Sequence, residues 1–234
     1  MITRRFLCTS GLMTIAAGVS GCSTMGVLPE LDDRREARPH FATRTVYRPN
    51  HRQVYGAIGS ERTPILAFDF TVLDPKFLRQ TVTFPTNEPI GTIFVDPGAH
   101  HLYFVEARGH ATRYGVGVGK EGFGWNGRAK INMKRDWPDW VPPAEMVARD
   151  PHIRAQLEPT PRGMGVRGGP KSPLGARAMY LFGPHGDLGY RIHGTTEPET
   201  IGSNVSSGCI RMINQDIIHL YSRAAIGTPV IVLA

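Results

Sequence analysis

Two side chains near the C-terminus have the chemistry of a nucleophile and its base. Cys209 lies in the segment 206–211 (SSGCIR), and His193 precedes it by sixteen positions. A thiol attacks carbonyl groups as the thiolate, and a nearby imidazole can accept its proton and later return it to a leaving amine. We therefore treat Cys209 as a candidate nucleophile and His193 as a candidate base.

Each of the two residues could instead have a purely structural role. A free cysteine is often a small buried apolar side chain, and a single histidine is often a hydrogen-bonded structural residue. Gly194 and Gly208 place turns beside them, where a side chain can face a cleft. We also expect the successive N–H groups of residues 207–209 to form an oxyanion hole.

The other two cysteines, Cys8 and Cys22, lie in an N-terminal leader. A basic start precedes an apolar stretch at 11–19 that is too short for a permanent membrane span and is typical of an export signal. Residues 19–22 (VSGC) resemble a lipobox, in which Cys22 would be acylated after cleavage. Cleavage near Cys22 without lipid attachment is the alternative. Cys209 is then the only thiol of the folded part, and an internal disulfide is excluded there.

Charged residues give further indications about export and about possible partners. The paired Arg4 and Arg5 resemble a twin-arginine signal that lacks its usual spacer residue. The chain has 234 residues and a formal charge of +7. A positive net charge favours a protein that acts near anionic phospholipids or acidic wall material. Its Lys and Arg residues are scattered, without a basic helix or a basic stripe, so we exclude nucleic acid as a partner.

The elements that must position Cys209 and His193 are mostly strands. We predict a signal peptide at 1–22, an N-terminal extension or tether at 23–88, and the folded domain at 89–234. Alternating apolar residues and turn signals predict strands at 92–95, 101–105, 111–118, 128–133, 178–182, 189–193, 209–212 and 229–233, after an earlier pair at 64–70 and 80–84.

Two helices are expected, at 143–149 and at 214–225. Asn214 is the candidate N-cap of the second helix, and Gly227 its stop. The Gly- and Pro-rich segment 158–175 is expected to be a long loop, of the kind that forms lids or binding loops.

The combined pattern resembles the signature of the L,D-transpeptidase (YkuD-domain) family. The matching residues are His193-Gly194-Thr195 and the Ser-x-Gly-Cys-Ile-Arg run at 206–211. The resemblance extends over about residues 89–234, through 114–119 (YGVGVG), 137–143, 168–170 (GGP) and 173–177 (PLGAR). It implies a mostly β, L,D-transpeptidase-like β-sandwich with one or two short helices.

The resemblance also implies roles for single residues. Cys209 takes the position of the nucleophile and His193 that of the base, and Gly194 stands where a backbone carbonyl orients the imidazole in some members. Arg211 matches the motif arginine, which holds a substrate carboxylate or stiffens the loop through an ion pair. Ser206, Ser207 and Gly208 complete the predicted substrate-binding loop. Ser207 replaces a histidine that is common in the family, so we expect altered substrate handling.

The implied reaction is an acyl transfer on peptidoglycan stem peptides. The thiolate of Cys209 would attack a tetrapeptide stem, release D-alanine and form a thioester. The acceptor stays open: a second stem gives a cross-link, an envelope protein becomes anchored to the wall, and water makes the enzyme a carboxypeptidase. No metal or organic cofactor is implied, and the expected location is the periplasm or cell envelope, with a membrane anchor if Cys22 is acylated.

Two rival classes follow from the same residues. The first is a non-catalytic wall-binding module of the same fold. The presence of both His193 and Cys209 makes this class less favoured. The second is a papain-like cysteine peptidase, which would place its cysteine before its histidine in the chain. Here the histidine comes first.

Overall fold

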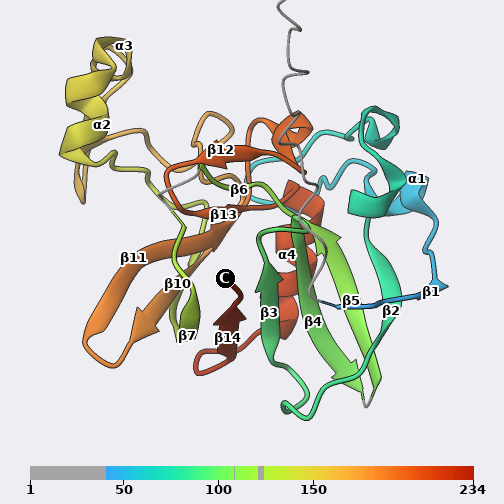
Figure 1. Ribbon diagram of the computed structural model, residues 1–234. Helices are drawn as coiled ribbons and strands as arrows, with labels where there is room; N and C mark the ends of the chain where they lie inside the picture. The colour runs from blue at the N-terminus through green and yellow to red at the C-terminus, as the bar shows by residue number, and fades with distance from the viewer. Residues whose placement is uncertain (1–40, 108, 121–123) are drawn as a thin grey trace, which may run out of the picture. The chain divides into compact units, whose positions relative to one another are not determined.

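The computed structural model describes residues 41–234 apart from 108 and 121–123 (Figure 1). The predicted leader, including Cys8 and the lipid-attachment candidate Cys22, lies outside the described residues. Among the described residues, no helix has the length and apolar character needed to cross a membrane.

A ten-stranded sheet is the main element of the fold, and it confirms the mostly β prediction. Its strand order is β1-β2-β5-β4-β3-β14-β7-β10-β11-β13. The strands are β1 (Thr45–Tyr47), β2 (Gln80–Phe84), β3 (Ile93–Asp96), β4 (His101–Ala107), β5 (Gly109–Gly115), β7 (Gly127–Asp136), β10 (Arg177–Gly183), β11 (Gly186–His193), β13 (Ile210–Arg211) and β14 (Pro229–Val232).

Short elements complete the described chain. Two small two-stranded sheets pair β6 (Val118–Gly119) with β12 (Asn204–Ser206), and β8 (Glu158–Thr160) with β9 (Gly163–Gly165). The α-helices are α1 (His51–Val54), α2 (Ala144–Arg149), α3 (Pro151–Arg154) and α4 (Asn214–Arg223). Three 3₁₀ turns lie at Phe70–Val72, Pro75–Phe77 and Pro198–Thr200.

The main core lies between the two halves of the sheet and α4. Strands β3 to β5 and strands β7, β10 and β11 lie on opposite sides of β14, with α4 behind them (Figure 1). Both halves contribute to one apolar cluster, and Ile217 and Leu220 of α4 are fully buried in it. The sheet therefore folds into a sandwich around a shared core, in which burial of apolar side chains is the main stabilising contribution.

Several expectations need correction. Residues 64–70 do not form a strand; Ile65 makes only an isolated bridge to Ile58, and Leu66 is 82% exposed, so the apolar residues have no sheet face to cover. Strand β2 pairs instead with β1 and β5. The expected loop 158–175 contains the β8–β9 hairpin. Four α-helices are present in the described residues rather than two, because the side chains of Asn50 and Asp150 cap the single turns of α1 and α3.

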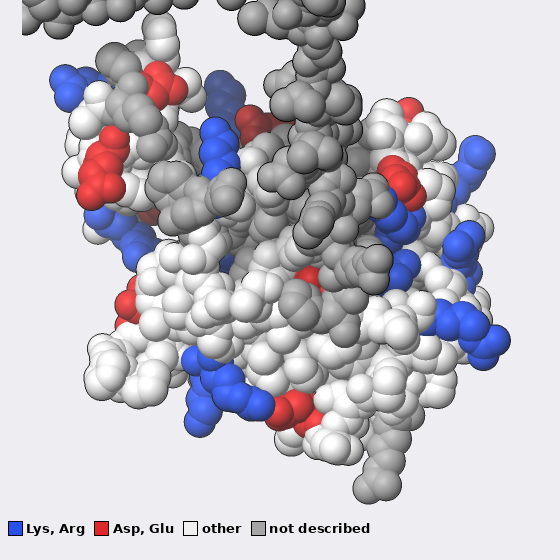
Figure 2. Space-filling model, viewed as in Figure 1, with Lys and Arg blue, Asp and Glu red and all other residues white. Residues whose placement is uncertain are grey.

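Charged side chains of both signs lie on the face of the protein that Figure 2 shows. On the face drawn in Figure 2, Lys and Arg occur at several separate places and are interspersed with Asp and Glu. This arrangement agrees with the scattered charge seen in the sequence.

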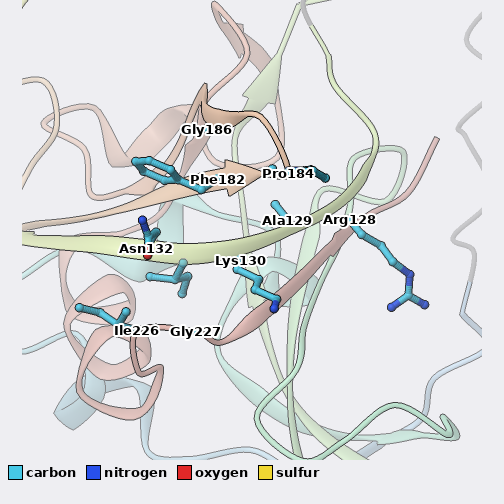
Figure 3. Close-up of a pocket in the computed structure, with 11 residues that line it drawn as sticks. Arg128, Ala129, Lys130, Asn132, Phe182, Pro184, Gly186, Ile226 and Gly227 are labelled. Carbon is cyan, nitrogen blue, oxygen red and sulfur yellow. The ribbon is translucent and has the colours of Figure 1, made fainter.

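A cavity of about 600 Å³ opens beside β7 and the turn between β10 and β11 (Figure 3). Its lining combines apolar side chains, such as Phe182 and Ile226, with Lys130 and Arg128. Neither His193 nor Cys209 lines this cavity. It is therefore separate from the residues that the sequence identified as reactive.

The described part of the predicted extension, residues 41–88, is folded and supplies β1 and β2 of the main sheet. Tyr55, Leu73 and Leu78 are buried in one cluster with Ile201 and Ile213. The last two residues belong to the segments on either side of Cys209, so the extension packs directly against the chain that carries the thiol. The boundary at residue 89 therefore does not separate two independent packing units.

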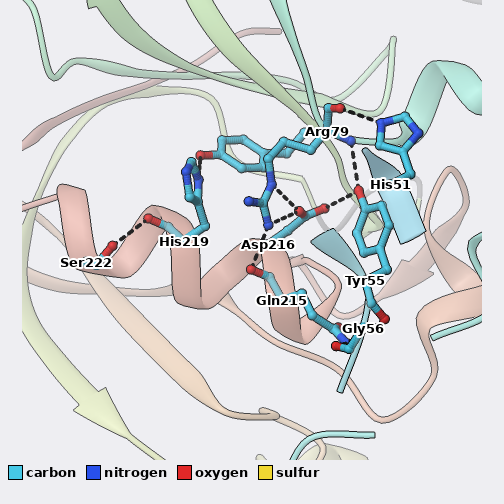
Figure 4. A network of polar contacts seen from close by, with 9 residues as sticks. His51, Tyr55, Gly56, Arg79, Gln215, Asp216, His219 and Ser222 are labelled. Carbon is cyan, nitrogen blue, oxygen red and sulfur yellow. Dashed lines mark hydrogen bonds and ion pairs between the residues drawn. The ribbon is translucent and has the colours of Figure 1, made fainter. Parts of the chain in front are cut away.

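A buried ion pair joins the same extension to α4 (Figure 4). Arg79 donates from Nε to Oδ1 of Asp216 at 2.8 Å, and the Tyr55 hydroxyl donates to Oδ2 at 3.2 Å. Asp216 is fully buried, and this burial raises the pKa of its carboxyl, while Arg79 opposes the rise. The carboxylate is thus stabilised only as long as its partners stay in place.

We predict that Asp216→Asn lowers the free energy of unfolding by about 3–5 kcal/mol, because it leaves the Arg79 cation buried without its charge partner. Urea denaturation measures the loss. The control is Asp74→Asn, whose partner Lys76 is about half exposed at 49%, and which should cost less than about 1 kcal/mol. Equal losses for the two variants would contradict the role given to the buried pair.

Candidate active site

The candidate base and nucleophile lie on two neighbouring parallel strands. His193 is the last residue of β11, and Cys209 directly precedes β13. The register pairs Ile192 with Ile210, and the Met212 N–H donates to the His193 carbonyl at 2.8 Å. The backbone N–H of Arg191 hydrogen-bonds to the Cys209 thiol. The structure therefore places on adjacent strands two residues that are sixteen positions apart in the sequence.

The two residues are directed away from the main core. Ile192 and Ile210 belong to the core cluster, and successive side chains of a strand alternate between its faces. Arg191 and His193 consequently lie on the opposite face of β11. The neighbouring strand continues this face, because Tyr180 of β10 pairs with Arg191 while Met179 pairs with Ile192 in the core.

His193 is held in one orientation by the residue that follows it. Its Nδ1 donates to the Gly194 carbonyl at 2.5 Å, which leaves Nε2 as the acceptor nitrogen. The side chain is only 4% exposed, and this burial lowers the pKa of His193 to about 4. The imidazole is therefore neutral at neutral pH and has a free lone pair, as a general base requires.

Asn214 fixes the turn that contains the Gly194 carbonyl. Its Nδ2 donates to the Thr195 carbonyl at 2.9 Å, and its Oδ1 accepts from the Ala176 N–H at 3.0 Å. The predicted helix cap is therefore wrong: Ile213 occupies the N-cap position, because the Asn214 side chain is used by these two loops. A Cβ atom at Gly194 would lie 2.2 Å from Asn214 Oδ1, which explains the glycine after the histidine.

Ser206 shapes the turn that presents Cys209. The Gly208 N–H donates to Ser206 Oγ at 3.1 Å, and the Ser206 hydroxyl donates to the Cys209 carbonyl at 2.5 Å. Gly208 has φ +113°, a backbone conformation that residues with side chains disfavour, so glycine is needed there. Because its N–H is already bonded, Gly208 does not supply the oxyanion donor that the sequence suggested. Ser207 is exposed beside this turn.

Arg211 forms an ion pair rather than standing free. Its Nη1 lies 2.9 Å from Oε2 of Glu197, which is 58% exposed. The backbone of Arg211 also bonds to Gly117 in both directions, at 2.8 and 3.0 Å. These contacts tie Arg211 to two neighbouring segments of the chain.

The electrostatic surroundings favour a neutral thiol at rest. Burial raises the pKa of Cys209, whereas the Arg191 N–H and the charges of Arg191 and Arg211 act in the opposite direction. With His193 also neutral, the resting pair is thiol and imidazole rather than thiolate and imidazolium. Such a pair can transfer the proton as the sulfur attacks a carbonyl. The described residues contain no group of three potential metal ligands.

We predict that alkylation of Cys209 by iodoacetamide accelerates with pH and reaches half its maximal rate above about pH 8.5, the ordinary value for a thiol. The reason is that the alkylating species is the thiolate, which burial disfavours here. Mass spectrometry of the peptide that contains Cys209 measures the rate. A midpoint near pH 6 would contradict a neutral resting pair.

Known proteins share this part of the chain. The model of the YkuD family, described as the L,D-transpeptidase catalytic domain, matches residues 90–232. The Escherichia coli K12 protein named Probable L,D-transpeptidase YbiS is 38% identical over 119 residues, which cover 49% of this chain and 35% of YbiS. ErfK/SrfK of the same strain, also named a probable L,D-transpeptidase, is 31% identical over 141 residues, covering 59% of this chain and 42% of that protein. The chain thus spans less than half the length of these two relatives.

Solved structures are also similar. A Brucella melitensis crystal structure, described as a probable carnitine operon oxidoreductase, is 48% identical with a TM-score of 0.46 and covers 70% of this chain and 99% of that one. A Mycobacterium tuberculosis L,D-transpeptidase is 16% identical with a TM-score of 0.43, and the match covers 62% of this chain and 58% of that one. Both TM-scores are below 0.5. The family match spans most of the residues described above, including both strands that carry the candidate pair, and the chain belongs to the YkuD family of L,D-transpeptidase catalytic domains.

Proposed function

We propose that this protein is a peptidoglycan L,D-transpeptidase that uses Cys209 as nucleophile and His193 as base. The observation that carries the proposal is the hydrogen bond from His193 Nδ1 to the Gly194 carbonyl, which directs a neutral Nε2 lone pair away from the backbone. The parallel register, which pairs His193 with Arg211 two positions after Cys209, supports the pairing of base and nucleophile. Together they supply a nucleophile, a base and an orienting group, as covalent acyl transfer needs.

The first half-reaction releases D-alanine. Nε2 of His193 accepts the thiol proton while Sγ of Cys209 attacks the carbonyl of the diamino acid in a tetrapeptide stem. The resulting oxyanion is stabilised by the backbone N–H groups of Ser207 and Cys209, since the Gly208 N–H is bonded to Ser206. The C–N bond then breaks, the imidazolium returns its proton to the leaving amine, and a thioester remains on Cys209.

The second half-reaction transfers the acyl group to an amine. The acceptor nitrogen attacks the thioester, a new C–N bond forms, and the C–S bond breaks. His193 takes the proton from the acceptor and returns it to the sulfur. An amine on a second stem gives a cross-link, and an amine on an envelope protein gives wall anchoring; with water, the same intermediate makes the enzyme an L,D-carboxypeptidase.

The chain organisation and location are part of the same proposal. Residues 1–22 act as a signal peptide that directs export to the periplasm or cell envelope, and Cys22 carries a lipid that attaches the protein to a membrane. Residues 89–234 form the catalytic domain. The extension 23–88 supports it, because its described part packs against Ile201 and Ile213 beside the Cys209 segment.

We predict that the protein releases D-alanine from a disaccharide-tetrapeptide and that Cys209→Ala abolishes the release. In the wild type, mass spectrometry should detect a thioester on Cys209, and a carbapenem should add covalently to the same residue. The control is Ser222→Ala on the exposed side of α4, which keeps the thiol and should keep the release of D-alanine. A wild type that shows neither D-alanine release nor an adduct would contradict the catalytic proposal and favour a wall-binding module.

We also predict that Asn214→Asp lowers kcat by about 100-fold, because misplacing a reacting group by about 1 Å can cost this much. Aspartate retains the acceptor for the Ala176 N–H but replaces the donor to the Thr195 carbonyl with a repelling oxygen. The KM of the donor peptide should change little, since Asn214 acts through the His193 turn. Steady-state kinetics and a melting curve check this; an unchanged kcat in a folded variant would contradict it.

A further inference from the structure

Three arginines lie on the face of the sheet that carries Cys209, and two of them have carboxylate partners. Arg191 makes two hydrogen bonds to Asp187, at 2.7 and 2.8 Å, and Arg211 pairs with Glu197 at 2.9 Å. Arg162 lies in the two-residue turn of the β8–β9 hairpin. Within residues 41–107, 109–120 and 124–234, no carboxylate contacts Arg162. Its positive charge is therefore available to a ligand.

Tyr180 fixes Arg162 on this face. The Arg162 Nη1 donates to the Tyr180 hydroxyl at 2.9 Å, and the guanidinium carbon lies 5.6 Å from the centre of the tyrosine ring. Arg191 stacks on the same ring at 4.3 Å. Tyr180 is only 2% exposed, so it is a rigid support between two cations rather than a mobile surface side chain.

The position of Tyr180 relates Arg162 to the thiol. Tyr180 pairs with Arg191 across β10 and β11, and the Arg191 N–H bonds to the Cys209 thiol. Neighbouring strands are about 4.8 Å apart, so Tyr180 lies about 10 Å from Cys209 across the strands. An acyl donor whose reacting carbonyl is at Cys209 would reach Arg162 with an extended side chain rather than with its backbone.

We propose that Arg162 binds the side-chain carboxylate of the diamino acid in the donor stem and thereby selects stems in which this carboxylate is free. The inference rests on the proposed transpeptidase function and assigns a specificity-determining residue to it. Guanidinium groups bind carboxylates through charge-assisted and often bidentate hydrogen bonds, and the one Nη bond to Tyr180 leaves other N–H groups for the ligand. Amidation of the carboxylate removes its charge and replaces one of its acceptor oxygens with a donor group.

The test compares two donors that differ only in this group. Disaccharide-tetrapeptides with a free or an amidated side-chain carboxylate are offered separately with the same amine acceptor, and D-alanine release gives kcat/KM. The wild type should prefer the free carboxylate by about tenfold. Arg162→Gln should lower kcat/KM for the free form to the level of the amidated form, without changing the amidated form, and Arg162→Lys should keep part of the preference.

Arg167→Gln is the matched control. Arg167 follows the same hairpin and is 64% exposed, but it already pairs with Glu158 at 3.5 Å, so its loss should leave the preference unchanged. Turnover of both donors by the wild type without discrimination, or an equal loss on both donors in Arg162→Gln, would overturn the assignment while leaving the proposed function intact. Absence of turnover with either donor would overturn the proposed function and this inference with it.

Discussion

Strand β11 runs parallel to β13, and the position of every reactive group depends on this pairing. Parallel neighbours place Ile192 beside Ile210 and His193 beside Arg211, so the turn that ends at Cys209 arrives next to the backbone of Arg191. A parallel pair cannot be joined by a tight turn, and the fifteen residues between His193 and Cys209 form the crossover. That connection contains β12, which pairs with β6 and sets the direction from which the chain approaches the thiol.

The two turns at the ends of this pair are held by hydrogen bonds from side chains. Asn214 bonds to two loops and fixes the carbonyl after His193, while Ser206 bonds on both sides of Gly208 and fixes the turn before Cys209. Burial then sets the charge state, because it disfavours both the imidazolium and the thiolate. A neutral imidazole and a neutral thiol are the physical result, and in the proposed reaction the proton leaves the thiol only as the sulfur attacks a carbonyl.

The sequence predicted strands and motifs better than it predicted side-chain contacts between segments that are far apart in the chain. Sequence patterns located the strands of the main sheet from β3 onward, because their buried residues alternate or run continuously. They missed the short strands β8, β9 and β12 and merged β5 with β6. Asn214 looked like a helix cap because its neighbours have helical spacing, and its bonds to Ala176 and Thr195 arise from chain segments that no local pattern relates. The same limit applies to Arg162, whose partner Tyr180 is eighteen positions away in the sequence. The packing of Tyr55 and Arg79 onto α4 also depends on contacts across more than 130 residues.

The most direct measurement of the central claim is the tautomer and charge of His193 in the free protein. Nitrogen-15 NMR of the labelled imidazole distinguishes Nδ1–H, Nε2–H and the doubly protonated ring. A neutral ring protonated on Nδ1 at pH 7, with protonation near pH 4, is the result that the hydrogen bond to Gly194 and the buried site predict. A doubly protonated ring at pH 7, or a neutral ring protonated on Nε2, would contradict the account.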